Sequence, residues 1–418
     1  MKTFNDVFYG WWIAIAAMTV LSVGAGVYWQ GFGVFFLPLA HEFSTSRAAL
    51  SGVVSISQLE GGLLGPVGGY LVDRYGPRKM MLIGGSFMGL GFLLLSQVQS
   101  LMMFYVVFLL VISVGMSIGI RVPALVAPVN WFIKKRGRAL GIATSGGGLG
   151  GVFVPFLGWL IVAVGWRTTA VIAGLMVWVV ALPLAFFMRT RPEDYGLLPD
   201  GERSVSQNVE TSENGLEDTI SGEAEYTLMQ ALKTPAFWFL AIVLGLRQLA
   251  IGAIALHQVP FLVGIGIRTE IAATVLGMTG VISILGRFGF GWLAEKISTR
   301  YVMAITMGLV ALGSFVLANV GTWWHLFFFV PIYAVGWGGG ATLMFALRAE
   351  YFGRKAFGTI SGAMDAIQMF GLVLGPVFAG LVYDLTESYY PAFITFAISA
   401  ALAALTMVFI RPPERRNG

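Results

Sequence analysis

Cysteine is absent from this 418-residue chain, and charged residues make up only 11% of it. The lack of cysteine excludes disulfides and thiolate metal sites. Soluble domains average about 25% charged residues, so this chain has too few to keep a folded surface in water. No nucleophile–base pair, metal cluster, phosphate-binding loop or pump ATPase motif is evident. We therefore expect no enzyme activity, no cofactor and no metal.

Hydrophobic residues, in contrast, make up 57% of the chain, and the 55 glycines suit a tightly packed bundle of membrane helices. A spanning helix needs about 20 mainly apolar residues. Twelve such runs predict an all-α membrane protein, and they cover residues 11–38, 49–72, 80–98, 101–129, 138–163, 167–188, 236–264, 270–294, 301–320, 324–347, 357–383 and 390–410. The first run is too long for the apolar core of a cleavable signal peptide.

The distribution of lysine and arginine predicts the orientation. Cytoplasmic loops carry an excess of these residues. With both termini inside, most of the 26 Lys and Arg residues fall on the cytoplasmic side, and only Arg47, Arg167 and Arg268 fall outside. Because the basic residues lie in short loops between apolar runs, the net charge of +5 does not indicate nucleic-acid binding.

A short motif occurs twice, separated by a little over half the chain length. The first copy is Gly69-Tyr-Leu-Val-Asp73-Arg74-Tyr-Gly76-Pro-Arg78-Lys79, and the second is Gly291-Trp-Leu-Ala-Glu295-Lys296-Ile-Ser-Thr-Arg300. Repetition at half-length indicates a duplicated fold. The glycines allow two membrane helices to approach closely, while the acid marks the water boundary and the bases stay on the cytoplasmic side.

The repeat predicts two six-helix bundles, residues 1–189 and 236–418, joined by a cytoplasmic linker at 190–235. The linker is rich in Ser, Gly and Glu and holds ten of the 21 acidic residues, a composition typical of disorder. A flexible tether is one interpretation, and a regulatory or partner-binding segment is the other. Residues 226–234 are expected to form a short interfacial helix before the seventh span.

Five fixed charges and one histidine lie inside the predicted spans. They are Glu60, Arg121, Arg247, Arg287, Asp365 and His257. Each charge costs roughly 2.5–3.5 kcal/mol on insertion scales and is a functional candidate by default. The fixed charges leave one positive charge in surplus, which an anionic substrate would offset. Gln30, Gln258 and Tyr28 supply polar groups for the same site. The rival interpretation is that the arginines pair with Glu60 or Asp365 and lock helices together.

The repeated motif resembles the signature of the major facilitator superfamily. Three further stretches resemble its monocarboxylate transporter and oxalate/formate antiporter branch. They are Tyr9-Gly10-Trp11-Trp12, the run from Trp131 to Gly146, and Arg287 followed by Gly289 and Gly291. The resemblance implies that Arg287 binds the substrate carboxylate. It also implies a conformational latch, for which the candidates are Gly69, Asp73, Arg74, Arg78, Glu295 and Arg300.

Two positions depart from the animal members of that branch. Gln30 stands where they carry a lysine, and Ser283 stands where they carry an aspartate four residues before the span-eight arginine. Lysine–aspartate proton coupling is therefore in doubt here. Asp365, Glu60 and His257 are the alternative proton-coupling candidates. Arg121 suggests either a second anionic group on the substrate or a different coupling scheme.

Together these features predict a monomeric, twelve-helix secondary transporter of small mono- or dicarboxylates in the bacterial inner membrane. The two halves are expected to rock about a midplane site, with proton symport. An anion exchanger without proton coupling is the main alternative. Drug or amphiphile efflux is disfavoured by the three buried arginines. A non-transporting sensor would need a signalling domain, for which 190–235 is too short and polar.

Overall fold

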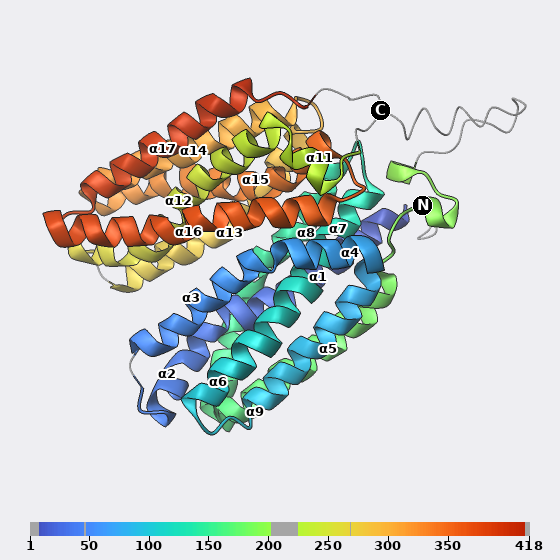
Figure 1. The fold of residues 1–418 in the computed structure, drawn as a ribbon. Helices are drawn as coiled ribbons and strands as arrows, with labels where there is room; N and C mark the ends of the chain where they lie inside the picture. Colours follow the sequence, from blue (N-terminus) through green and yellow to red (C-terminus); the bar gives the residue numbers. More distant parts are fainter. Residues whose placement is uncertain (1–7, 46, 202–224, 268, 414–418) are drawn as a thin grey trace, which may run out of the picture. The chain divides into compact units, whose positions relative to one another are not determined.

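Every regular element that the structure describes is a helix. The computed structural model (Figure 1) describes residues 8–45, 47–201, 225–267 and 269–413, and no strand occurs in those ranges. The all-α prediction is confirmed. Each of the twelve predicted apolar runs coincides with helix.

The helices of the N-terminal half are interrupted more often than hydropathy predicts. They are α1 Tyr9–Gly24, η2 Ala25–Gln30, α2 Phe32–Glu42, α3 Arg47–Leu63, α4 Gly65–Tyr75, α5 Pro77–Leu95, α6 Leu101–Val107, η3 Phe108–Ser113, η4 Gly115–Arg121, α7 Val122–Trp131, α8 Arg136–Leu149, η5 Gly150–Val152 and α9 Phe153–Phe187. The segments η2, η3 and η4 are π-helical, so their backbone hydrogen bonds join residues i and i+5 instead of i and i+4.

The C-terminal half is built of longer uninterrupted helices. They are α11 Leu228–Leu232, α12 Pro235–Gly264, α13 Thr269–Leu293, α14 Thr299–Ala318, α15 Leu326–Phe352, α16 Phe357–Thr386 and α17 Tyr390–Phe409. Short 3₁₀ turns, η6 Glu193–Tyr195, η7 Pro199–Gly201 and η8 Trp323–His325, complete the set. Helix α11 confirms the short helix predicted within residues 226–234.

Ten helical stretches in the described residues are long and apolar enough to cross a membrane. One of them, Arg136–Phe187, contains two predicted crossings, because Gly165 breaks α9 with a φ of 81°. The second predicted crossing is formed by α3 and α4, which are separated at Leu64. The protein is thus a multi-pass membrane protein, and its helices account for the twelve predicted crossings.

Contacts between Cα atoms divide the chain into two units. The first unit runs up to Ala231 and also includes Arg348–Gly362, while the second contains Leu232–Leu347 and Ala363–Pro413. The last turn of α15 and the first turns of α16 therefore belong to the first unit. The bundle limits predicted from sequence, 1–189 and 236–418, stay a prediction.

In the first unit, α1 packs against α7, α8 and α9, and α5 packs against α9 and η4. Figure 1 shows α5 and α9 side by side. Helix α5 approaches η4 closely, because a Cβ added at Gly84 would collide with the backbone of Gly119. Small residues at such crossings let membrane helices gain dispersion contacts that larger side chains would prevent.

In the second unit, α17 packs against α14 and α12, and α12 also contacts α13. Fully buried apolar side chains from these helices and α15 form one core, which includes Ile254, Val310, Phe329 and Phe396. Helix α15 approaches α13 closely, because a Cβ at Gly338 would collide with the carbonyl oxygen of Ser283. This contact brings Ser283 of α13, and hence the turn carrying Arg287, against the glycine-rich part of α15.

The predicted disorder of the 190–235 linker is wrong for its first twelve residues. Asp200 is only 5% exposed and accepts backbone hydrogen bonds from residues 133–135, and Glu193 pairs with Arg354. Composition gave no sign of this order, because the segment gains it from polar contacts with distant backbone rather than from apolar burial. Residues 202–224 lie outside the described residues.

One ion pair of the first unit yields a pH prediction. Arg167 donates to the Glu42 carboxylate at the end of α2, and Trp166 Nε1 donates to the other oxygen at 2.6 Å. The Arg167 hydrogen bond lowers the pKa of Glu42 below its ordinary 4.5. The stabilisation that this ion pair contributes is therefore fully present above pH 4.5, and it is lost as the pH falls through the lowered pKa of Glu42.

Replacing Glu42 by glutamine is expected to lower the free energy of unfolding by less than about 1 kcal/mol at neutral pH, because the pair is exposed. Thermal unfolding in detergent measures this. The wild-type unfolding temperature should decline between about pH 5 and pH 3 more steeply than that of E42Q. Parallel curves for the two proteins would show that the pair contributes nothing.

Candidate functional site

The π-helical stretches of the first unit carry three of the predicted substrate-binding residues. Tyr28 and Gln30 lie in η2, and Arg121 is the last residue of η4. A π-helical turn leaves backbone and side chains out of the regular register, and such turns occur frequently at functional sites. Neither the composition nor the periodicity of these runs predicted the π-helical geometry.

Ser113 joins two of the candidates in the first unit. The Tyr28 hydroxyl donates to Ser113 Oγ at 3.0 Å, and the Ser113 side chain is also hydrogen-bonded to Glu60. Glu60 and Arg121 both act electrostatically on the Tyr28 hydroxyl. Glu60 Oε1 is buried without a hydrogen-bond partner among the described residues. Ser113 thus joins the Tyr28 hydroxyl to the Glu60 carboxyl group, and Arg121 acts on the same tyrosine.

Gln30 and Tyr28 are held differently. Gln30 is exposed, and its Nε2 donates to the carbonyl oxygen of Gly147 at 2.9 Å. Tyr28 is 4% exposed and stacks on Phe108 with a ring separation of 5.4 Å. Tyr28 is therefore fixed by its neighbours, whereas the amide of Gln30 remains accessible.

Arg247 of α12 is the most deeply buried charged candidate, at 1% exposure. Its guanidinium donates to the carbonyl oxygen of Trp337 at 2.8 Å and to Gln248 Oε1 at 3.2 Å. A Cβ at Gly340 would lie 2.6 Å from the guanidinium, so the glycine of α15 provides the space it occupies. Both acceptors are neutral, and Arg247 Nε has no partner among the described residues.

Arg287 of α13 reaches the same region of the second unit. It is 7% exposed, and its Cζ lies 5.9 Å from the centre of the Trp337 ring, within cation–π range. It is near enough to Arg247 to repel it electrostatically. The structure therefore brings two predicted substrate-binding arginines together around Trp337, where an anion would relieve their repulsion.

Two buried glutamines of the second unit have unsatisfied amides. Gln258 is 1% exposed, and neither its nitrogen nor its oxygen has a hydrogen-bond partner in the described residues. Gln368, at 3% exposure, has an unpartnered Nε2. An unmade buried hydrogen bond costs about 1–3 kcal/mol, which a polar ligand or water would recover. Gln368 lies three positions from Asp365 on α16.

The remaining proton-coupling candidates are placed as follows. His257 Nε2 lies 3.0 Å from the carbonyl oxygen of Pro376, to which it must donate, and Nδ1 lies 3.2 Å from the Tyr389 hydroxyl. Both ring nitrogens are thus satisfied in the neutral form. Asp365 is half-buried on α16.

The predicted latch is centred on Asp73. One carboxylate oxygen accepts from Gly358 N at 3.1 Å, and the other accepts from Thr359 N and Thr359 Oγ1, both at 2.8 Å. Burial raises the pKa of Asp73, while these hydrogen bonds act in the opposite direction. A Cβ at Gly69 would collide with Gly358, so glycine is required for this approach. The carboxylate thus lies at the positive N-terminal end of α16.

The basic latch candidates have aromatic neighbours. Arg74 donates to the Tyr70 hydroxyl at 2.8 Å, and this bond raises its pKa. The Arg78 guanidinium lies 4.8 Å from the Phe186 ring. In the second copy of the motif, Arg300 donates to the Tyr301 hydroxyl at 2.9 Å, and Glu295 is half-buried. A latch role for these residues stays a prediction.

Comparisons with known proteins agree with this architecture. The family model of the Major Facilitator Superfamily matches residues 17–364 and 265–418. Monocarboxylate transporter 12-B of Danio rerio is 24% identical over 98% of this chain and 89% of the relative. The oxalate:formate antiporter of Oxalobacter formigenes is 23% identical over 96% of this chain and 91% of the relative.

Solved structures show the same fold. The crystal structure of FucP, a transporter of this superfamily in the outward conformation, superposes with a TM-score of 0.71. That match has 16% identity and covers 97% of this chain and 100% of FucP. The human organic anion transporter MFSD10 superposes with a TM-score of 0.65 at 14% identity, over 96% of this chain and 98% of the other.

Proposed function

The chain belongs to the Major Facilitator Superfamily of transporters, and from that premise we propose that it carries small organic anions, mono- or dicarboxylates, by alternating access in symport with protons. The observation that carries the proposal is the pair Arg247 and Arg287. Both guanidiniums are more than nine-tenths buried beside Trp337, and the acceptors of Arg247 are neutral. Buried like charges in one region favour an anionic ligand.

Arginine suits this role because its guanidinium stays charged and can hold a carboxylate through two parallel hydrogen bonds. Arg287 is the proposed substrate clamp. Arg247 is held by Trp337 and Gln248 and supports the positive potential around it. Gln258 and Gln368 offer unsatisfied amides in the same unit. The relatives named as monocarboxylate transporters and as an oxalate:formate antiporter support a carboxylate as the substrate.

Glu60 is the proposed proton-coupling group that the geometry supports best. It shares Ser113 with the buried Tyr28, so a hydroxyl chain leads to its carboxyl group. Arg121 belongs to the same cluster and supplies an opposite charge whose influence would change with substrate binding. Asp365 and His257 remain alternatives. The satisfied ring of His257 makes it the weaker of the two.

Anion exchange without proton coupling is the second candidate. It is favoured by the relative named as an oxalate:formate antiporter. It is also favoured by Gln30 and Ser283, which replace the lysine and aspartate of the animal monocarboxylate branch. An exchanger requires that the carrier reorients only with a substrate bound. The positive charges of Arg247 and Arg287 would then be neutralised by one of the two exchanged anions in each reorientation.

Transport by the purified chain in liposomes tests the proposal and separates the two candidates. Labelled monocarboxylates and dicarboxylates are added with an inward proton gradient. Symport predicts accumulation that an uncoupler abolishes, whereas exchange predicts counterflow that the uncoupler leaves unchanged. If no carboxylate of either class moves under either condition, the proposed substrate class is wrong.

The proposed setting is the bacterial inner membrane, with both termini in the cytoplasm and the chain acting as a monomer. The excess of Lys and Arg on one side of the predicted topology supports this orientation. Its partners are then the lipid bilayer, the anionic substrate and protons. Accessibility of tags placed at each terminus in sealed vesicles measures the orientation.

A further inference from the structure

Residues 189–201, here called the strap, are folded although their composition predicts disorder. The strap contains the turns η6 and η7, and it uses the left-handed backbone conformation at Gly196 and Gly201. Asp200 adopts the same conformation with a φ of 63°, which is unfavourable for a residue with a Cβ. Strain of this kind persists only where surrounding contacts determine it.

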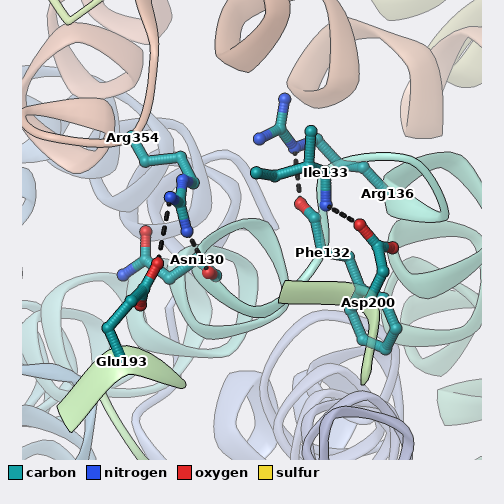
Figure 2. Close-up of polar contacts among 7 residues, drawn as sticks. All are labelled: Asn130, Phe132, Ile133, Arg136, Glu193, Asp200 and Arg354. Carbon is teal, nitrogen blue, oxygen red and sulfur yellow. Dashed lines mark hydrogen bonds and ion pairs between the residues drawn. The ribbon is translucent and has the colours of Figure 1, made fainter. Parts of the chain in front are cut away.

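Asp200 anchors one end of the strap. Its carboxylate accepts hydrogen bonds from the backbone nitrogens of Ile133, Lys134 and Lys135, at 2.9, 2.8 and 2.8 Å. Figure 2 shows Asp200 pointing at the Ile133 nitrogen, beside the bond from Arg136 to the Phe132 carbonyl. These donors directly precede α8, where the helix end favours a negative charge. Charge-assisted bonds at 5% exposure make this a strong attachment.

Arg189 anchors the other end. Its guanidinium lies between two aromatic rings, 4.1 Å from the centre of Tyr9 and 4.1 Å from the centre of Tyr195. Its carbonyl oxygen accepts from Trp131 Nε1 at 3.0 Å. The next residue, Thr190, fills the space beside Gly76 in the first copy of the repeated motif. The strap is therefore fixed to the loops that follow α4 and α7.

Glu193 lies between these anchors and binds Arg354. The two side chains meet at 3.1 Å, and Arg354 also donates to the carbonyl oxygen of Asn130 at 2.7 Å. Figure 2 shows Arg354 reaching both acceptors. Arg354 is 7% exposed and Glu193 is 26% exposed. Arg354 lies in the turn between α15 and α16, within the Arg348–Gly362 segment that belongs to the first unit.

We infer that the strap is a gating element and that Glu193 holds and releases the 348–362 turn during the transport cycle. The difference between its contacts supports this division. Asp200 is 5% exposed and its carboxylate accepts three backbone hydrogen bonds, whereas Glu193 is 26% exposed and its pair with Arg354 is a single contact at 3.1 Å. The Glu193–Arg354 ion pair can therefore open while the Asp200 hydrogen bonds keep the strap folded. Asp73 holds the same turn at Gly358 and Thr359, so two carboxylates of the first unit share it.

The inference rests on alternating access as proposed above, but its test needs neither a carboxylate nor transport. The chain has no cysteine, so Ser361→Cys introduces a single reporter thiol on the held segment. Ser361 is 7% exposed, and its hydroxyl has no hydrogen-bond partner in the described residues, so the exchange removes no bond of that side chain. The rate of maleimide labelling in detergent then measures how often the segment is released.

Glu193→Gln in the S361C background is expected to raise the labelling rate about fivefold, since a partly exposed, charge-assisted pair is lost. Asp194→Asn is the matched control. It also removes one negative charge, at the neighbouring position, but from a side chain that is exposed. Its labelling rate should equal that of the parent. A rise in E193Q that high salt reproduces in the parent supports the inference. Equal rates in E193Q and D194N overturn it, even if the unfolding temperature of E193Q is lower.

Discussion

Replacing Arg287 by alanine is expected to lower the initial rate of carboxylate uptake in liposomes by about 100-fold or more. Truncating one partner of a buried, hydrogen-bonded charge pair costs about 2–5 kcal/mol, and every 1.4 kcal/mol is about tenfold. Arg287 is 7% exposed and lies beside a second buried cation, so its charge is poorly screened by solvent. The substrate carboxylate would lose its direct partner together with much of the local positive potential.

Two further variants make the result specific. Arg287→Lys keeps the charge but not the planar pair of donors, so we expect a loss of about tenfold, smaller than that of R287A. Arg411→Ala removes an arginine from an exposed position of the same unit and should transport normally. Uptake by R287A equal to that by R411A would contradict the clamp assignment. The family and the fold would be unaffected by that outcome.

The helices could be predicted because their signal is local. Each of the twelve runs is continuous and apolar, and a backbone in hydrocarbon must satisfy its own hydrogen bonds, so such runs become helices. The same local reasoning located α11 within residues 226–234. It could not locate the π-helical stretches of η2, η3 and η4, because hydropathy identifies an apolar run as helical without distinguishing an α-helical turn from a π-helical one.

The candidate site was predictable in its charges but not in its contacts. Hydropathy identified Arg247 and Arg287 as cations in apolar runs, since such residues are rare there. That they meet at Trp337 depends on Gly340, whose missing side chain admits the Arg247 guanidinium from another helix. The order of the strap was missed for a related reason. Asp200 binds backbone more than 60 residues away, and no window of sequence contains both partners.

Asp73→Asn is the second change expected to have a large effect, with uptake reduced about tenfold or more. The two carboxylate oxygens accept three hydrogen bonds from Gly358 and Thr359. In asparagine, one oxygen becomes an NH₂ group that faces donors, so at least one bond is lost along with the charge at the N-terminus of α16. Each hydrogen bond to a charged group is worth about 1.5–3 kcal/mol.

A graded series separates a latch from a simple helix cap. Thr359→Val removes only the hydroxyl bond and leaves Thr359 N as a donor, so its effect on uptake should be smaller than that of D73N. If Asp73 only caps α16, D73N lowers the unfolding temperature, but uptake well below that temperature stays normal. If Asp73 holds the turn as part of the cycle, uptake falls at temperatures where the protein remains folded. In that case D73N should also raise the labelling rate of S361C, because Asp73 and Glu193 hold the same 348–362 segment.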